Sequence, residues 1–376
     1  MNTKAIKVVF CANSSWYLYN FRKTTIKAFV LAGFDVHCIA PRDNYSEKIE
    51  GIGASFSSFK FHPSSLNPFI ELMTLWDLIK IYFKIRQHYT FNFTPKINIY
   101  SSLAAQLVNS SVVNNISGLG SAFLKKSVFS FFIMMLYRIS NLKVKKIFFQ
   151  NKRDMNLFLE KKIIHDSKCE LINGSGVDLD DFYFSEMTNK NTLRFILMCR
   201  LIKEKGVYLF VKAAKVLKKE FPNELEFVIA GFIDKHKKDA VTLTEIEDWE
   251  KDEIIKFKGP IDDVKDELAQ SHCAVLPTFY PEGLPKFLLE SAAMGKIIVT
   301  SDTPGCSEVV EDGVNGFLCQ TQSLDSLIKC LKKVISLSIK KRAEMSLNSR
   351  LRAEKMFSDK IIINKYLDCI QDNNHL

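Results

Sequence analysis

At 376 residues the chain is too long for one ordinary hydrophobic core, and its length suits two domains of about 180 residues each. Hydrophobic residues make up 47% and charged residues 25%, as in globular proteins, and no apolar run reaches the roughly 18 residues that a membrane-spanning helix needs. The nine cysteines are scattered without a C-x-x-C pair, which excludes a disulfide framework and a cysteine zinc site. Because residues 1–15 show no signal-peptide pattern, we expect a cytoplasmic protein.

The net charge of +10 is concentrated in the first half of the chain. Residues 1–186 hold 23 basic and 14 acidic side chains, and residues 101–150 hold six basic side chains and no acidic one. This surplus predicts an anionic partner for the first domain: a phospholipid, a diphosphate or a nucleic acid.

Apolar runs of strand length alternate with amphipathic stretches of helix length along the whole chain. The expected strands are 6–12, 35–41, 145–150, 169–175, 194–200, 225–231, 254–260, 273–278 and 296–301. The alternation predicts parallel sheets in two doubly wound α/β domains. We place the domains at 1–183 and 192–357, with the polar segment 183–192 between them, and expect the amphipathic helix of 358–376 to return to the first domain.

Three stretches of the first half carry possible functional residues. The segment CANSSWYLYNFRK (11–23) holds Asn20 and Arg22, and we interpret it as one wall of a cleft that faces a donor substrate. ISGLGSAF (116–123), with Ser117 and Gly118, is an ordinary turn or a close backbone approach, but its spacing does not fit a dinucleotide-binding loop. The stretch 123–146 is apolar in the middle and basic at both ends, which fits either a helix lying on an anionic membrane or a buried helix with snorkelling lysines.

The second half contains two charged constellations at expected strand ends. In RLIKEKG (200–206), Arg200 ends a strand and Lys205 opens a helix, where two cations can hold a diphosphate. In PEGLPKFLLESAAMGK (281–296), Glu282 lies in a loop, Pro285 suits a first helical turn and Glu290 lies inside the helix. A helix N-terminus at this edge of a sheet suits a diphosphate, and the paired carboxylates suit the hydroxyl groups of a nucleotide-sugar. Two solvated surface acids are the alternative.

The sequence indicates no metal site. The segment DLDD (178–181) follows a loop near the expected domain boundary and is more typical of a helix cap than of a metal motif. The seven histidines are dispersed, and neither a P-loop nor a G-x-S-x-G motif is present.

Taken together, these motifs resemble the GT-B-fold retaining glycosyltransferases of family 4, whose fold is two Rossmann-like domains facing a cleft. The first half also resembles a narrower group, the PglA-like N-acetylgalactosaminyltransferases of O-antigen, lipopolysaccharide and lipid-linked glycan assembly. The segments that carry the resemblance are GSGVD (174–178), CRLIKEKG (199–206), KGPIDDV (258–264), PTFYPEGLPKFLLESAAMGK (277–296), SDTPGCSEVVEDGVNGFL (301–318), NFRK (20–23), APRDNY (40–45), SSLNPF (64–69), TPKINIYSSLA (94–104) and ISGLGSAF (116–123).

The resemblance implies specific roles for the residues of these motifs. Arg200 and Lys205 would hold the donor diphosphate, Glu282 the transferred sugar and Glu290 the ribose. The backbone of Gly283, Leu284, Pro285 and Lys286 would cradle phosphate, and Val264 would lie near the base. Asn20, Arg22, Ser117 and Gly118 would lie on the acceptor side, where no histidine stands at the place that many family members use.

The reaction implied is transfer of a sugar, with N-acetylgalactosamine favoured, from a UDP-sugar to a polyprenyl-diphosphate-linked sugar. It would need no metal or other cofactor and no nucleic acid, and the enzyme would be peripheral on the inner face of the cell membrane. Two other classes stay open. A UDP-N-acetylglucosamine 2-epimerase would need acid and base carboxylates in the first domain, and residues 101–150 offer none. A non-enzymatic protein that binds nucleic acid or membrane would leave 200–206 and the glutamate pair unexplained.

Overall fold

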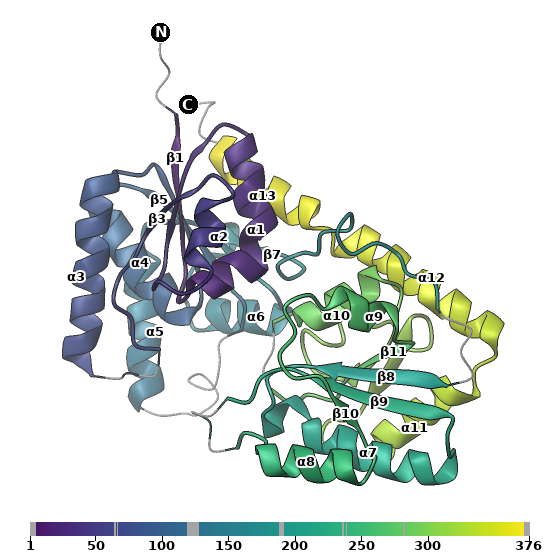
Figure 1. The fold of residues 1–376 in the computed structure, drawn as a ribbon. Coiled ribbons are helices and arrows are strands. Elements are labelled where there is room, and N and C mark those ends of the chain that lie inside the picture. The colour runs from purple at the N-terminus through teal and green to yellow at the C-terminus, as the bar shows by residue number, and fades with distance from the viewer. Residues whose placement is uncertain are drawn as a thin grey trace. The chain divides into compact units, whose positions relative to one another are not determined.

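The computed structural model describes residues 5–63, 65, 67–118, 128–187, 192–234, 237, 239–280 and 283–371, without the side chains of residues 128 and 129. The chain forms two compact units, one from residues 1–175 with 359–376 and the other from residues 176–358 (Figure 1). Each unit has one sheet, and every strand pairing within the two sheets is parallel.

The sheet of the first unit has the order β3-β2-β1-β4-β5-β6-β7. Its strands are β1 Lys7–Cys11, β2 Asp35–Ile39, β3 Ser55–Ser57, β4 Tyr89–Phe93, β5 Ser111–Ile116, β6 Val144–Phe149 and β7 Cys169–Leu171. Its helices are α1 Ser15–Leu31, α2 Ser46–Glu50, α3 Pro68–Ile85, α4 Pro95–Leu107, α5 Val128–Ser140, α6 Lys152–Glu160 and α13 Asp359–Gln371, with a 3-10 turn at Asp166–Lys168.

Successive residues of a strand point to opposite faces of the sheet, so the first unit has two cores. Val8 and Phe10 of β1 pack in the core that includes residues of α1, α2 and α13, whereas Val9 and Cys11 pack in the core that includes residues of α3, α4, α5 and α6. The helices α3, α4 and α5 therefore cover one face of the sheet together, as Figure 1 also shows.

The sheet of the second unit has the order β10-β9-β8-β11-β12-β13. Its strands are β8 Leu193–Met198, β9 Leu225–Ala230, β10 Lys256–Phe257, β11 Cys273–Leu276, β12 Ile297–Ser301 and β13 Gly316–Cys319. Its helices are α7 Val207–Glu220, α8 Leu243–Lys251, α9 Lys265–Ala269, α10 Lys286–Ala293, α11 Leu324–Ser336 and α12 Ile339–Met356, with a 3-10 turn, η3, at Lys203–Lys205.

The boundary between the units lies earlier than the segment 183–192 that the sequence suggested. The backbone N–H of Val177 donates to the carbonyl of Phe357 at 2.8 Å, and Phe182 is buried in the core of the second unit. The polar composition of 183–192 is misleading because Ser185 still donates its N–H to the carbonyl of Met294 at 3.3 Å, within the second unit.

The C-terminal helix α13 belongs to the first unit. Tyr366 is fully buried there, its ring 5.4 Å from that of Phe91, and its hydroxyl lies 2.5 Å from the Asn115 Oδ1. The Tyr89 hydroxyl donates to the carbonyl of Ile370 at 3.1 Å. Burial of an aromatic ring and two polar contacts thus tie the last helix to β4 and β5.

The sequence analysis does not predict the central strands β4 and β5, because asparagine residues interrupt their apolar runs. The amide of Asn92 donates to the Asn114 Oδ1 at 2.9 Å, and the amide of Asn114 donates to the Asn141 Oδ1 at 2.8 Å. Asn92 and Asn114 are fully buried and hydrogen-bonded, so the cost of removing their amides from water is offset. Sequence periodicity does not show such pairing, because the partners lie on different elements.

A fully buried lysine immediately before β12 makes the stability of the second unit depend on pH. The Lys296 Nζ donates to the carbonyls of Ser185 at 3.2 Å and Ala269 at 3.3 Å, which carry no full charge. Burial lowers the pKa of Lys296 to about 8. The unfolded chain, with an ordinary lysine pKa of about 10.4, then binds more protons than the folded chain between these two values, and stability rises with pH there.

We therefore expect the wild-type protein to gain free energy of unfolding relative to Lys296→Met as the pH rises from 7 to 10. The gain should be on the order of 2 kcal/mol. Urea denaturation of both proteins at the two pH values measures it, and groups that titrate in both proteins cancel in the difference. Parallel pH dependences of the two proteins would show that Lys296 is not the group responsible.

Candidate donor-binding site

The order of the second sheet defines where a ligand is expected. From β8 the chain continues to β9 and β10 on one side, whereas β11 is followed by β12 and β13 on the other. In an open parallel sheet, ligands bind at the carboxyl ends of the strands where the order reverses in this way. The described residues of the loops that follow β8 and β11, namely 199–206, 277–280 and 283–285, lie at this reversal point, and they hold most of the predicted second-half site residues.

Hydrogen bonds to the backbone carbonyl of Glu204 connect these two loops. The carbonyl oxygen of Glu204 accepts from the N–H of Phe279 at 2.8 Å, the N–H of Tyr280 at 3.1 Å and the Thr278 hydroxyl at 3.0 Å. Gly206 has a φ of +79°, and a Cβ there would stand 2.2 Å from the carbonyl oxygen of Pro277. Only glycine allows the loops to approach this closely.

The loop contact brings two predicted cations to one aromatic ring. The Arg200 guanidinium carbon lies 5.9 Å and the Lys205 Nζ 5.3 Å from the centre of the Tyr280 ring. The Arg200 Nη1 also forms an ion pair with Asp234 at 3.3 Å, and its side chain keeps 31% of its surface exposed. Two positive charges at the carboxyl edge of the sheet are suited to a diphosphate.

Electrostatics at Lys205 favour an added anion. Burial is the main cause that lowers the pKa of Lys205; the Cys199 and Cys306 thiols oppose it, and the charge of Arg200 lowers the pKa further. A lysine with a lowered pKa holds its proton less firmly than usual. A bound dianion would restore the proton, so binding of an anion and protonation of Lys205 support each other.

The helix α10 adds a further group to this edge. It begins after Pro285, which takes the N-cap position without a side-chain capping bond, and its dipole places partial positive charge there. Gly283, Leu284 and Pro285 are buried, and Lys286 is half-buried. The predicted phosphate cradle therefore exposes little side-chain surface, and its donors would be backbone N–H groups.

The carboxylate of Glu290 is more buried than the sequence suggested. Its residue retains 6% exposure, and the Lys286 Nζ lies 3.1 Å from the Glu290 Oε1. Burial raises the pKa of Glu290, Lys286 opposes that shift, and the carboxylates of Asp181 and Asp263 add to it. A buried carboxylate with a single salt-bridge partner retains acceptor capacity for a ligand hydroxyl.

Val264 and Glu282 are the remaining site residues that the sequence predicts in the second half. Val264 stands at the N-cap of α9, half-buried and packed against the core of the second unit. Pro281 and Glu282 lie outside the described residues, so the proposed role of Glu282 in holding the sugar stays a prediction.

The predicted acceptor-side residues all lie in the first unit. Ser117 and Gly118 are half-buried and follow the carboxyl end of β5, and Asn20 donates from its side chain to the carbonyl of Trp16 at 2.9 Å. Arg22 differs from expectation, because it is fully buried with its guanidinium carbon 4.4 Å from the centre of the Phe93 ring. The side chain thus packs in the interior of this unit instead of lining an open wall.

Sequence reasoning missed Tyr280 and Asp234. Tyr280 stands immediately before the Pro281-Glu282-Gly283 loop, and an aromatic residue beside that loop is the signal that was available. Asp234 follows β9 and reaches Arg200 only because β8 and β9 are neighbours in the sheet. Nothing local in the sequence marks that second contact.

Each unit matches a family model of glycosyl transferases over most of its length. Residues 180–352 match the family model of the glycosyl transferases group 1, and residues 7–151 match that of the glycosyl transferase 4-like proteins. The chain is 26% identical to the N,N'-diacetylbacillosaminyl-diphospho-undecaprenol alpha-1,3-N-acetylgalactosaminyltransferase of Campylobacter jejuni, over 96% of this chain and 97% of that protein. It is 23% identical to the UDP-Gal:alpha-D-GlcNAc-diphosphoundecaprenol alpha-1,3-galactosyltransferase of Escherichia coli, over 70% of each.

Solved structures show the same fold at low identity. A glycosyltransferase from Rickettsia africae superposes with a TM-score of 0.79 at 17% identity, over 98% of each chain. Anabaena Alr3699/HepE in complex with UDP superposes with a TM-score of 0.78 at 16% identity, over 98% of this chain and 100% of that one. The two parallel-sheet units thus have the GT-B fold that the sequence predicted.

Proposed function

Because the chain belongs to the GT-B glycosyltransferases, with a group 1 match in its second half and a 4-like match in its first, we propose that it transfers a sugar from a UDP-sugar to a sugar carried on a polyprenyl diphosphate. The observation that carries the proposal is the pair of cations, Arg200 and Lys205, around Tyr280 at the reversal point of the second sheet. The names of two relatives support the acceptor class, since both proteins act on a sugar linked to diphospho-undecaprenol.

In the proposed complex the second unit holds the donor. Arg200, Lys205 and the N-terminus of α10 bind the two phosphates, Glu290 accepts from the ribose hydroxyls and Glu282 holds the transferred sugar. Val264 lies near the base. The nucleotide-sugar thus spans α10 from its N-terminus to Glu290, which accounts for the eight-residue interval between the glutamates.

The proposed transfer retains the anomeric configuration. The acceptor hydroxyl oxygen forms the new bond to the anomeric carbon on the face from which UDP departs, the bond to the UDP oxygen breaks, and the hydroxyl proton passes to a phosphate oxygen of the leaving group. Fixed positive charge from Arg200, Lys205 and the α10 dipole stabilises the departing diphosphate. The favoured donor is UDP-N-acetylgalactosamine, and the enzyme works at the inner face of the cell membrane in surface polysaccharide or glycan assembly.

A donor panel tests the proposal. UDP-N-acetylgalactosamine, UDP-N-acetylglucosamine, UDP-galactose and UDP-glucose are each offered with a polyprenyl-diphosphate-linked sugar, and the product linkage is determined by NMR. We expect one donor to be preferred and the new linkage to have the α configuration of the donor. A β-linked product would contradict retention, and free UDP without a glycosylated lipid would contradict the acceptor class.

Metal removal provides a separate test of how the leaving group is stabilised. Because protein cations are proposed to take the place of a divalent ion, EDTA is expected to change turnover by less than about twofold. The assay compares initial rates with EDTA and with added Mg²⁺ or Mn²⁺. A loss of more than about tenfold that either ion restores would show that a metal ion supplies the positive charge.

A further inference from the structure

The helix α3 of the first unit carries a continuous apolar outer face. Its exposed hydrophobic side chains, with exposures of 45–77%, are Phe69, Leu72, Met73, Trp76 and Phe83. The intervals of three, one, three and seven residues place them on one side of a helix with 3.6 residues per turn. A cluster of this kind on a surface marks a site of interaction with a protein or a membrane.

The opposite side of α3 is fixed to its own unit, so the helix cannot turn its apolar face inward. Thr74, Leu78 and Tyr82 are buried, and the Thr74 hydroxyl lies 3.2 Å from the carbonyl of Lys60. Near the start of the helix, Glu71 forms an ion pair of 2.7 Å with Lys96.

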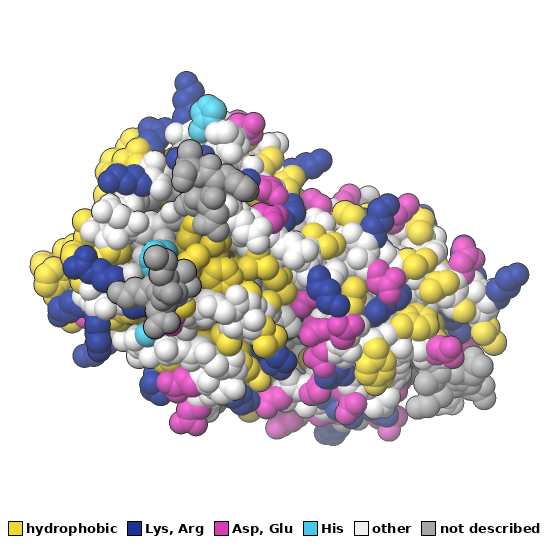
Figure 2. Space-filling view, turned by 90° about the horizontal axis from the view of Figure 1, so that it is seen from above, with side chains coloured by type: hydrophobic (Ala, Val, Ile, Leu, Met, Phe, Trp, Pro, Cys, Tyr) yellow, Lys and Arg dark blue, Asp and Glu magenta, His cyan; other side chains and the backbone are white. Residues whose placement is uncertain are grey.

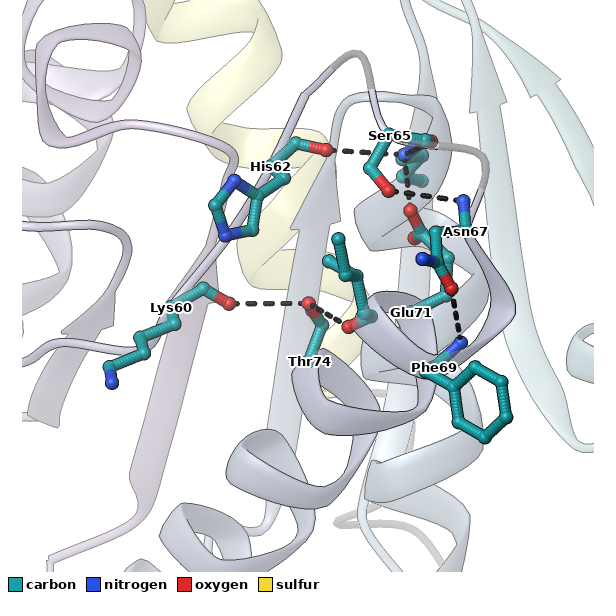
Figure 3. A network of polar contacts seen from close by, with 9 residues as sticks. Lys60, His62, Ser65, Asn67, Phe69, Glu71 and Thr74 are labelled. Carbon is teal, nitrogen blue, oxygen red and sulfur yellow. Dashed lines mark hydrogen bonds and ion pairs between the residues drawn. The ribbon is translucent and has the colours of Figure 1, made fainter.

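The beginning of α3 is also held by capping contacts. The Asn67 side chain accepts from the N–H of Phe69 at 3.0 Å, and the N–H of Asn67 donates to the Ser65 hydroxyl at 3.1 Å. Figure 3 shows this network around the first turn, with the ring of Phe69 pointing away from it. The outward direction of the apolar side chains is therefore built into the packing of the helix.

A second apolar stripe lies on α5 and the residue that follows it closely. Its exposed members are Phe131, Phe132, Met135, Ile139 and Leu142. Both α3 and α5 pack against α4 and cover the same face of the sheet. In Figure 2, hydrophobic side chains with Lys and Arg beside them gather at the edge where Figure 1 places α3.

The exposed charges beside these stripes are basic, whereas the two acidic residues of α3, Glu71 and Asp77, are half-buried. Lys80 and Lys84 are the exposed charged side chains of α3, and the sequence of α5 contains no acidic residue. The Lys80 Nζ lies 5.4 Å from the Trp76 ring, and the Arg86 guanidinium carbon lies 5.0 Å from the Phe83 ring. Aromatic residues with adjacent cations are typical of segments at the boundary between lipid headgroups and acyl chains.

We propose that α3 and α5 form a membrane-docking face whose apolar side chains enter the interface of an anionic bilayer while their cations meet the lipid headgroups. The face consists of the ten exposed apolar residues named above together with Lys80 and Lys84. A second copy of the chain fits less well, because a two-fold contact brings the same patch of both copies together and the exposed charges of this patch are basic on both. Within the described part of the chain no helix is both long and apolar enough to cross a membrane.

This assignment changes which residues of 123–146 matter. The sequence pointed to lysines at both ends of one helix, but α5 ends at Ser140 and β6 begins at Val144. Lys145 donates to the carbonyl of Cys369 at 2.6 Å, and Lys146 forms an ion pair of 2.7 Å with Glu170. Lys125 and Lys126 lie outside the described residues. Half of the apolar residues of the face come from α3, which the sequence did not single out.

The experiment measures cosedimentation of the full chain with vesicles in the absence of any substrate. Vesicles of phosphatidylcholine alone are compared with vesicles that contain one third phosphatidylglycerol. The apolar variant is Leu72→Gln, Met73→Gln and Trp76→Gln together, and the charge variant is Lys80→Gln with Lys84→Gln. A matched control replaces three exposed leucines of the second unit, Leu243→Gln, Leu347→Gln and Leu351→Gln.

The wild type and the control are expected to bind the anionic vesicles and to bind neutral vesicles more weakly. The apolar variant should lose at least tenfold in vesicle affinity, and the charge variant about fivefold for each lysine removed. UDP binding and the circular dichroism spectrum should be unchanged in every variant, because all the replaced side chains are exposed. Absence of vesicle binding would contradict membrane docking without bearing on sugar transfer. Absence of transfer in the donor panel would contradict the proposed function without bearing on vesicle binding.

Two kinds of outcome, one in vesicle binding and one in oligomeric state, would overturn the proposal. One is equal vesicle affinity of the wild type and the apolar variant, or an equal loss in the control. The other is a wild type that sediments as a dimer and an apolar variant that sediments as a monomer, since the face would then be an interface between copies.

Discussion

Replacement of Lys205 by methionine is expected to lower the turnover number about 10²- to 10³-fold, the usual cost of removing one positioned electrostatic group. The Lys205 Nζ stands beside the Tyr280 ring, together with Arg200, where the leaving diphosphate is proposed to gain charge. Methionine keeps most of the length of the side chain and removes only its charge. The protein should remain folded, because its buried environment already disfavours the charged form of the lysine.

The matched control for this experiment is Lys203→Met on the same 3-10 turn. Lys203 is exposed, so its loss should change turnover by less than about twofold. Initial rates with saturating donor and acceptor measure turnover, and calorimetry with UDP measures affinity. If Lys205→Met keeps turnover within about threefold of the wild type, the diphosphate is stabilised by other groups and the proposed site is misplaced.

Replacement of Glu282 in the loop and replacement of Glu290 in α10 are expected to impair different steps, catalysis in the first case and donor binding in the second. Glu282→Gln should lower the turnover number roughly 10²-fold with little change in UDP affinity, because the sugar that it is proposed to hold reacts in the transition state. Glu290→Gln should weaken binding of UDP and of the donor by about 1.5–3 kcal/mol, the value of a hydrogen bond to a charged group. The ribose that it would hold takes no part in the reaction.

The surroundings of Glu290 in the structure make glutamine a suitable replacement for it. Glu290 is buried with Lys286 as its salt-bridge partner, and glutamine preserves its shape while Lys286, 28% exposed, can be hydrated. Glu247→Gln, at an exposed position of α8, serves as the control and should match the wild type. Loss of UDP affinity in Glu282→Gln but not in Glu290→Gln would reverse the two roles. Full turnover in both variants would remove the glutamate pair from the site.

The α/β architecture could be predicted from local patterns of apolar residues, because such patterns depend only on residues that are close in the sequence. Apolar runs such as 6–12, 35–41, 225–231 and 296–301 overlap with strands of the structure, and the alternation with helices gave two parallel-sheet α/β units. Buried parallel strands are recognisable when they are continuously apolar. The same rule failed at β4 and β5, where the buried Asn92 donates across the strands to Asn114.

Motif spacing determined which residues belong together in the second unit. Arg200 and Lys205 stand close in sequence and at the end of a strand, so their placement at the carboxyl edge followed from local structure alone. Their meeting with Tyr280 did not, because it depends on β8 and β11 lying side by side although they are some 80 residues apart. Pairing of strands is a property of the whole sheet, and no short segment encodes it.

Tertiary packing also decided what is inside and what is outside. Arg22 stands in a polar-looking segment, yet it is fully buried against Phe93. The helix α3 is apolar on both sides, and the same residue types serve as core at Leu78 and Tyr82 and as surface at Leu72 and Trp76. Hydrophobicity alone does not say which side of a helix meets the sheet, and only the packing of α3 against α4 exposed the face that we assign to the membrane.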